Sequence, residues 1–262
     1  MNKPVIITRD PWQRLKTLTN ARVALGRSGV SLPTEEVLRF GLAHAQARDA
    51  VHQPLNVVAL QTGLQAAGLS ALAVSSQAAD RSVYLRRPDW GRRLSAESAD
   101  LLKTQGAALW GAAPKLVFVV ADGLSSLAAQ SHSLALLQAL APYIPDIRSL
   151  PVVMATQARV ALGDEIGALL GAEQVVVLIG ERPGLSSPDS LGLYLTASPR
   201  PSLTDADRNC ISNVRPQGLD YPQAARKLAY LIAGARRLGR SGVDLKDDSD
   251  SLPAGEGFLA LG

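Results

Sequence analysis

The stretch QVVVLIGERPGLSSPD, residues 174–189, decides the expected fold. Its apolar run at residues 175–179 is rich in β-branched side chains and has the length of a strand buried on both faces, as in a parallel sheet. A polar loop begins at Gly180 and brings together Glu181, Arg182, two prolines and paired serines. Ligands of open parallel sheets bind beyond the carboxyl ends of the strands, so this loop is either a ligand site or an ordinary exit from a strand.

The sequence on both sides of this stretch predicts strands and helices in alternation. A β-α-β-α-β order requires right-handed crossovers and a mostly parallel sheet. The strand nearest the C-terminus alternates in polarity, which is typical of a sheet edge, and the last helix is expected to turn Leu228, Leu231 and Ile232 toward the sheet. The predicted strands are residues 116–120, 152–154, 175–179 and 191–197. Three helices are predicted: one that ends at about residue 141, one at 164–170 and one at 222–238.

These patterns predict an α/β fold: a Rossmann-like, mostly parallel sheet domain over residues 111–246, preceded by a mainly helical region at 21–110. In the helical region Thr34 is a good N-cap for a helix to about residue 51, and Ser95 for a helix at about 96–106. A further helix is expected at 57–69. Residues 1–20 read as an arm that is either disordered or laid over a partner, and 247–262 as a flexible tail.

Composition excludes several classes of protein. Hydrophobic residues make up 47% of the 262 residues and aromatic residues only 4%, so the core must consist mostly of Ala, Leu and Val. The net charge is +4, but acidic and basic residues alternate, which argues against a nucleic-acid groove. No segment approaches the length of a membrane span. The single cysteine allows no internal disulfide and fits a reducing cytoplasm.

Three loops are expected at one edge of the sheet, at residues 122–126, 157–160 and 180–189, and their convergence favours a ligand pocket. The glycine-rich dinucleotide and P-loop motifs are absent, as is the nucleophile elbow of serine hydrolases. His132 is not placed to activate Ser125. No catalytic residue and no metal-ligand set is therefore assigned.

A second unusual stretch is residues 81–93, where five of thirteen residues are arginine. Such a segment can hold a phosphate or carboxylate, contact a neighbouring subunit, or form a solvated face. Cys210 lies among polar residues, which places it near a surface or a ligand. Contact is a better expectation for it than nucleophilic catalysis, because no histidine is near it in sequence.

Five short motifs, in this order and spacing, resemble the small (light) subunit of ethanolamine ammonia-lyase. The resemblance extends from about residue 15 to residue 246. The motifs are ALGRSG at residues 24–29, RFGLAHAQARDAVH at 39–52, ADGLS at 121–125, LIGERPGLS at 178–186 and DRNCISN at 207–213.

The resemblance implies an adenosylcobalamin-dependent lyase that splits ethanolamine into acetaldehyde and ammonia. In this family a large subunit, a TIM barrel, carries the substrate site and the radical chemistry, and the small subunit covers the corrin. The family's cobalamin contacts fall on Val160 in ARVA, Glu181 in GERP and Cys210 in RNCI. The chain is then expected to be inactive without the large subunit, and its arm and arginine-rich stretch to be subunit contacts.

Two other readings of the residues stay open. The chain could be a free-standing α/β enzyme that uses Asp122, Glu181 or Ser125 on a small acyl or phosphorylated substrate, or a non-catalytic adaptor that docks through its basic loops. For the lyase subunit, a cytoplasmic location is expected, either free or inside a bacterial microcompartment. No targeting peptide is recognisable in residues 1–20.

Overall fold

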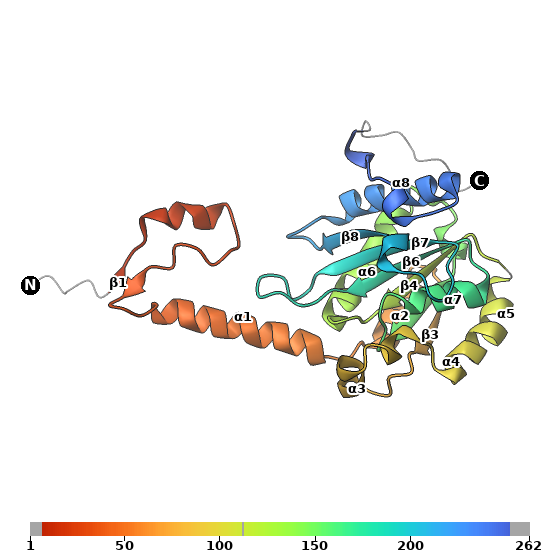
Figure 1. Cartoon of the computed structure of the whole chain (residues 1–262), viewed down its shortest axis with the longest axis horizontal. Helices are drawn as coiled ribbons and strands as arrows, with labels where there is room; N and C mark the ends of the chain where they lie inside the picture. The colour runs from red at the N-terminus through yellow and green to blue at the C-terminus, as the bar shows by residue number, and fades with distance from the viewer. Residues whose placement is uncertain (1–6, 112, 252–262) are drawn as a thin grey trace, which may run out of the picture.

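The computed structural model describes residues 7–111 and 113–251. Its centre is a six-stranded sheet in the order β3-β5-β4-β6-β7-β8 (Figure 1). The first four strands are mutually parallel, and β7 and β8 add in antiparallel fashion, so the predicted α/β class with a mostly parallel sheet is confirmed. The strands are β3 (Ala71–Ser75), β4 (Leu116–Ala121), β5 (Val152–Thr156), β6 (Gln174–Gly180), β7 (Leu191–Ala197) and β8 (Arg208–Val214).

Helices cover both faces of this sheet. One face packs against α2, α6 and α8, and the other against α4 and α7. The helices are α1 (Thr34–His52), α2 (Val57–Ala66), α3 (Arg81–Arg86), α4 (Ala96–Leu101), α5 (Ala107–Trp110), α6 (Ser126–Leu140), α7 (Leu162–Leu170) and α8 (Tyr221–Leu238), with a π-helical turn at Leu102–Gly106. Short 3-10 turns are η1 (Pro11–Thr17), η2 (Trp90–Arg92), η4 (Ile147–Ser149), η5 (Asp205–Asp207), η6 (Gly242–Asp244) and η7 (Ser249–Ser251).

Alternation along the central strands divides the core into two halves. Phe118 and Val120 of β4 join the cluster that contains Leu228 of α8, whereas Val119 joins the cluster that contains Ile166 of α7. All of β4 and β6 is buried. Burying each such side chain stabilises the fold by about 1.5–3 kcal/mol, which explains why these strands are continuous apolar runs. As predicted, Leu228, Leu231 and Ile232 of α8 are buried.

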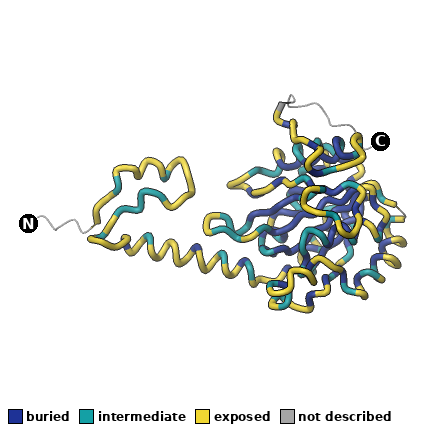
Figure 2. Tube along the Cα trace, viewed as in Figure 1, coloured by how far each residue is buried: buried dark blue, intermediate teal, exposed yellow. Residues whose placement is uncertain are grey.

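The first long helix, α1, contacts the body of the protein at its C-terminal end, where Ala50 is buried. It extends away from the sheet together with the N-terminal segment (Figure 1), and most of its length is exposed (Figure 2). Large apolar side chains of this helix face solvent: Leu38 is 68% exposed and Leu42 60%. The predicted cap is wrong, because Thr34 is the first helical residue and Pro33 precedes it without a side-chain capping bond.

The described part of the N-terminal arm is an irregular loop closed by two short strands. β1 (Ile7–Thr8) pairs antiparallel with β2 (Arg27–Ser28). The arm touches the loop between β6 and β7, where Arg22 donates to the carbonyl of Leu185 at 3.4 Å. Residues 1–6 of the predicted arm lie outside the described residues.

Three strand predictions differ from the structure. β3 was not predicted, because Ala-Leu-Ala-Val-Ser is short and weakly β-branched, yet it pairs with β5 and so brings part of the 21–110 region into the sheet. β8 was not predicted either, because it is polar along the side that faces solvent. β7 is therefore not an edge strand, since β8 lies outside it. The division at residue 110 stays a prediction.

The C-terminal segment is held on the body of the protein as far as it is described. Leu245 and Ser249 are buried, and Lys227 of α8 pairs with Asp247 at 3.3 Å and Asp250 at 2.7 Å. Residues 252–262 of the predicted tail lie outside the described residues. Among the helices that the structure describes, none has the length and apolar character needed to cross a membrane.

Candidate ligand site

A cavity of about 450 Å³ lies at the carboxyl edge of the parallel strands. All three predicted loops contribute to it: Gly123 follows β4, Val160 follows β5, and Glu181 follows β6. Tyr84 of α3 and Tyr194 of β7 complete its wall. The predicted convergence of these loops is thus confirmed, and the cavity lies where open parallel sheets bind ligands.

Two glycines allow the loops to close together at this edge. A Cβ on Gly180 would lie 1.9 Å from the carbonyl oxygen of Ser125, and one on Gly123 would lie 2.1 Å from the carbonyl oxygen of Gly180. Gly123 also has a positive φ of 56°. The N–H of Leu124 donates to the Gly180 carbonyl at 2.9 Å and joins the two strand ends. Only glycine permits this backbone approach.

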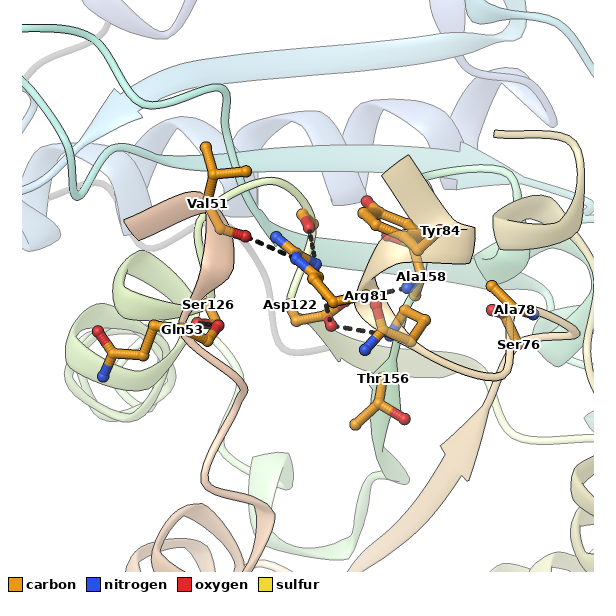
Figure 3. A network of polar contacts seen from close by, with 12 residues as sticks. Val51, Gln53, Ser76, Ala78, Arg81, Tyr84, Asp122, Ser126, Thr156 and Ala158 are labelled. Carbon is orange, nitrogen blue, oxygen red and sulfur yellow. Dashed lines mark hydrogen bonds and ion pairs between the residues drawn. The ribbon is translucent and has the colours of Figure 1, made fainter. Parts of the chain in front are cut away.

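Asp122 fixes the loop that carries Val160. Its carboxylate accepts the backbone N–H of Gln157 at 2.8 Å and of Ala158 at 2.9 Å (Figure 3). Arg81 lies 3.4 Å from the same carboxylate and also donates to the Gly123 carbonyl at 2.8 Å. Burial raises the pKa of Asp122, and these donors oppose that shift. Asp122 is therefore occupied in holding backbone and is not a free acid or base.

Arg81 therefore has an internal role, unlike a solvated or partner-contacting arginine. Its Nε donates to the carbonyl of Val51 at the end of α1 at 2.7 Å, and its guanidinium lies 4.7 Å from the centre of the Tyr84 ring. It connects α1, α3 and the loop after β4 (Figure 3). The other four arginines of residues 81–93 are exposed, so their predicted contact with a subunit stays a prediction.

Glu181 presents one carboxylate oxygen to the protein and leaves the other available. Its Oε2 accepts the hydroxyl of Ser190 and, at 3.3 Å, the backbone N–H of Asn213. Within the described residues Oε1 carries no hydrogen bond. A Cβ on Gly192 would lie 3.0 Å from this oxygen, so the glycine leaves room for it. Glu181 is thus oriented as a hydrogen-bond acceptor beside the cavity.

Cys210 lies one strand beyond the cavity wall. It is exposed and pairs across the sheet with Tyr194, whose ring lines the cavity. Burial raises the pKa of Tyr194, and the neighbouring Cys210 and Glu181 raise it further, so the phenol stays protonated. The geometry brings Val160 and Glu181 to one cavity and places Cys210 next to it. The role of all three toward a cofactor stays a prediction.

Side chains at the start of α6 and within it hold the loop between β6 and β7 by hydrogen bonds. His132 Nε2 lies 3.3 Å from Asp189 Oδ2, and His132 Nδ1 lies 2.8 Å from the Tyr221 hydroxyl. Ser125 donates its hydroxyl to the carbonyl of Pro188 at 2.7 Å. His132 and Ser125 thus form hydrogen bonds to different residues of this loop and not to each other. This agrees with the prediction that His132 is not placed to activate Ser125.

Three wall residues were missed from sequence: Tyr84, Arg159 and Tyr194. Tyr84 lay within the arginine-rich stretch, and Tyr194 lay in a strand taken for an edge. Arg159 adjoins Val160, so the loop prediction included its position without assigning it a function. Among the described residues no group of three or more His, Cys, Asp or Glu side chains could hold a metal ion.

The fold and cavity together define an α/β protein with a candidate ligand site at the carboxyl edge of a parallel sheet, and among the described lining residues there is no nucleophile-base pair. A family model described as "Ethanolamine ammonia-lyase light chain" matches residues 9–246. The chain belongs to this family, whose members are subunits of a carbon–nitrogen lyase.

Curated relatives agree over nearly their whole lengths. A protein of Azotobacter vinelandii named "Ethanolamine ammonia-lyase small subunit" is 55% identical over 97% of each chain. Relatives with the same name from Ralstonia nicotianae and Xanthomonas campestris pv. campestris are each 54% identical, covering 94% and 95% of this chain and 92% of their own. These matches confirm the resemblance inferred from the five motifs.

Proposed function

We propose that this chain is the small subunit of an adenosylcobalamin-dependent ethanolamine ammonia-lyase and that it covers and orients the cobalamin against a large catalytic subunit. The observation that carries the proposal is the position of Val160 and Glu181, which share one cavity although 21 positions of sequence separate residue 160 from residue 181. Cys210 lies on the next strand, beside Tyr194.

The chemistry of this wall fits a corrinoid. Corrin side chains end in carboxamides, whose N–H groups can donate to the open Oε1 of Glu181 in a charge-assisted bond. Val160 and Tyr194 offer apolar surface, and Cys210 a soft, weakly polar one. When bound, the cofactor supplies the radical chemistry, and the residues of this chain hold and orient it.

The size of the cavity supports a shared site. A volume of about 450 Å³ suits part of a large macrocycle but not the whole of it. The remaining surface of the corrin would be covered by the large subunit, which the family name of a light chain implies. The exposed arm, α1 and the exposed arginines of residues 86–93 are proposed contacts with that subunit. A cytoplasmic location, free or in a microcompartment, belongs to the same proposal.

The test is reconstitution with a co-expressed large subunit. We expect the complex to bind adenosylcobalamin and release acetaldehyde from ethanolamine, and the isolated chain to release none. Glu181→Ala in the complex should weaken cobalamin binding about 10- to 100-fold, because a charge-assisted hydrogen bond contributes about 1.5–3 kcal/mol. Spectrophotometric titration measures the affinity, and thermal unfolding of the variant checks the fold.

Glu173→Ala is the matched control, since this exposed glutamate precedes β6 at the opposite end of the strand. It should leave the affinity unchanged. Equal cobalamin affinity of the Glu181→Ala and unaltered complexes would reject the role of Glu181. Turnover of ethanolamine, or of an acyl or phosphorylated substrate, by the isolated chain would instead favour a free-standing enzyme.

A further inference from the structure

Arg159, at the wall of the cavity, is a cation with no anionic or hydrogen-bonding side-chain partner among the described residues. It lines the cavity together with Tyr84 and Val160. Among the described residues, the guanidinium makes no hydrogen bond and no ion pair, and its Nε is buried and unsatisfied. Buried polar groups are normally satisfied, and a buried donor without an acceptor is destabilising. The missing acceptor is therefore expected to come from outside this chain.

The protein nevertheless holds Arg159 in place. The guanidinium lies 4.4 Å from the centre of the Tyr84 ring, and Tyr84 is anchored by donating its hydroxyl to the Ala158 carbonyl at 3.0 Å. The backbone N–H of Arg159 donates to the Gly91 carbonyl at 2.7 Å. A Cβ on Gly91 would lie 3.0 Å from Cγ of Arg159 and 2.9 Å from the Tyr84 ring. The side chain is thus oriented before any ligand arrives.

Arg159 and Glu181 offer complementary chemistry across one cavity. Glu181 Oε1 can accept an N–H, whereas Arg159 can only donate. A carboxamide carries both an N–H donor and a carbonyl acceptor, and a phosphodiester carries acceptors only. Arg182, the other arginine of the wall, is exposed, so water can solvate its guanidinium.

Resting on the proposed function, we propose that Arg159 is a further corrinoid-binding residue that donates hydrogen bonds to an oxygen acceptor of the cofactor. The acceptor is either a carboxamide oxygen on the edge of the corrin or the phosphodiester of the nucleotide loop. Both sources share the chemistry that a fixed guanidinium recognises. In either case Arg159 positions the cofactor and transfers no proton.

The test compares Arg159→Gln with the unaltered chain, each in complex with the large subunit. Cyanocobalamin and cobinamide, which lacks the nucleotide loop and its phosphate, are titrated separately and followed by their visible absorbance. Arg159→Gln should weaken cyanocobalamin binding about 10- to 100-fold. An equal loss for cobinamide identifies a carboxamide as the acceptor, and a loss confined to cyanocobalamin identifies the phosphodiester.

Arg159→Lys covers the case in which Arg159→Gln does not fold. It keeps the positive charge but loses the planar donor fork and its stacking on Tyr84, so cyanocobalamin binding should still weaken about 10-fold. Arg237→Gln, an exposed position on α8, is the control and should change neither affinity.

Unchanged affinity of folded Arg159 variants for both corrinoids would overturn this inference while leaving the proposed function intact. Failure of the unaltered complex to bind either corrinoid would overturn the proposed function and the inference with it.

Discussion

Asp122 is tightly held beside the cavity. It is 2% exposed, and its two carboxylate oxygens accept two consecutive backbone N–H groups from the loop after β5. That loop carries Arg159 and Val160 into the cavity. A single buried carboxylate therefore determines where two of the wall residues lie.

Asp122→Asn should destabilise the chain by about 1–3 kcal/mol, because an amide accepts only one of the two backbone donors and orphans the other. Denaturant unfolding measures the difference in free energy. Asp100→Asn, at an exposed position on α4, is the control and should stay within about 0.5 kcal/mol of the unaltered chain.

The same substitution changes the pH dependence of stability. Burial raises the pKa of Asp122, so the folded chain binds this proton more tightly than the unfolded chain does. The free energy of unfolding then falls as pH rises from the ordinary pKa of aspartate to the raised one, and is flat above it. Asp122→Asn should lack this fall in unfolding experiments from about pH 4 upward. If the free energy of unfolding had the same slope against pH in both proteins, the raised pKa of Asp122 would be contradicted.

Among individual residues, the sequence identified those that belong to motifs. Val160, Glu181 and Cys210 were assigned because short family motifs surround them; the structure places the first two at the cavity, and the role of all three toward a cofactor stays a prediction. Arg159 lies in the same motif as Val160 but received no role, and Tyr84 lies in no motif, because the proximity of these two residues depends on α3 folding back beside the loop after β5. No local pattern encodes a contact between residues 75 positions apart in the chain.

At the scale of elements, the ends of β4 and β6 depend on glycine. Gly180→Ala should destabilise the chain by about 1–3 kcal/mol, or more, because the added Cβ would overlap the Ser125 carbonyl and force the backbone apart. Thermal unfolding tests this. Gly41→Ala is the matched control: this glycine lies within α1 with open space around it, so alanine should stabilise the helix by about 0.5–1 kcal/mol.

A Gly180→Ala protein as stable as the unaltered chain would mean that the two strand ends can separate without loss. A Gly41→Ala protein that is less stable would show that α1 is packed against something at that position.

Strands were predicted correctly where burial on both faces made them apolar, as in β4 and β6. β3 and β8 were missed for opposite reasons. β3 consists mostly of small residues and resembles a connection, whereas β8, which carries Cys210, alternates with polar residues because it is the outer strand beside β7. In both cases pairing with a neighbouring strand, and not local preference, determines the structure.

At the scale of the whole molecule, apolar side chains are distributed unevenly. The apolar core surrounds the sheet, whereas the projecting N-terminal part is mostly exposed (Figure 2). Its exposed apolar side chains include Leu18 (82%), Val30 (105%) and Leu38 (68%). Contiguous exposed apolar surface often marks an interface with another protein, and we propose that these side chains contribute to one. Its position on a projecting helix and arm agrees with the proposed contact with the large subunit.

Replacing Leu18, Val30 and Leu38 together by serine should leave the melting temperature of the isolated chain nearly unchanged, because exposed side chains add little to its stability. The affinity for the large subunit, followed by co-elution, should fall at least 10-fold. Leu109→Ser with Val243→Ser is the control, since these exposed residues lie elsewhere on the molecule. Undiminished association of the triple variant would exclude this surface as the interface.

The order of strands in the sheet also has a consequence for local opening. Glu181, Tyr194 and Cys210 come from one meander, β6-β7-β8, whose pairings span short stretches of chain. Tyr84 depends on α3, which follows the edge strand β3, and β3 is paired only through Ala71–Ser75 to the distant β5. Loop closure over long separations is entropically unfavourable. In native-state hydrogen exchange, β3 and α3 should therefore open before β6, so that the cavity loses its Tyr84 wall while Glu181 stays in place.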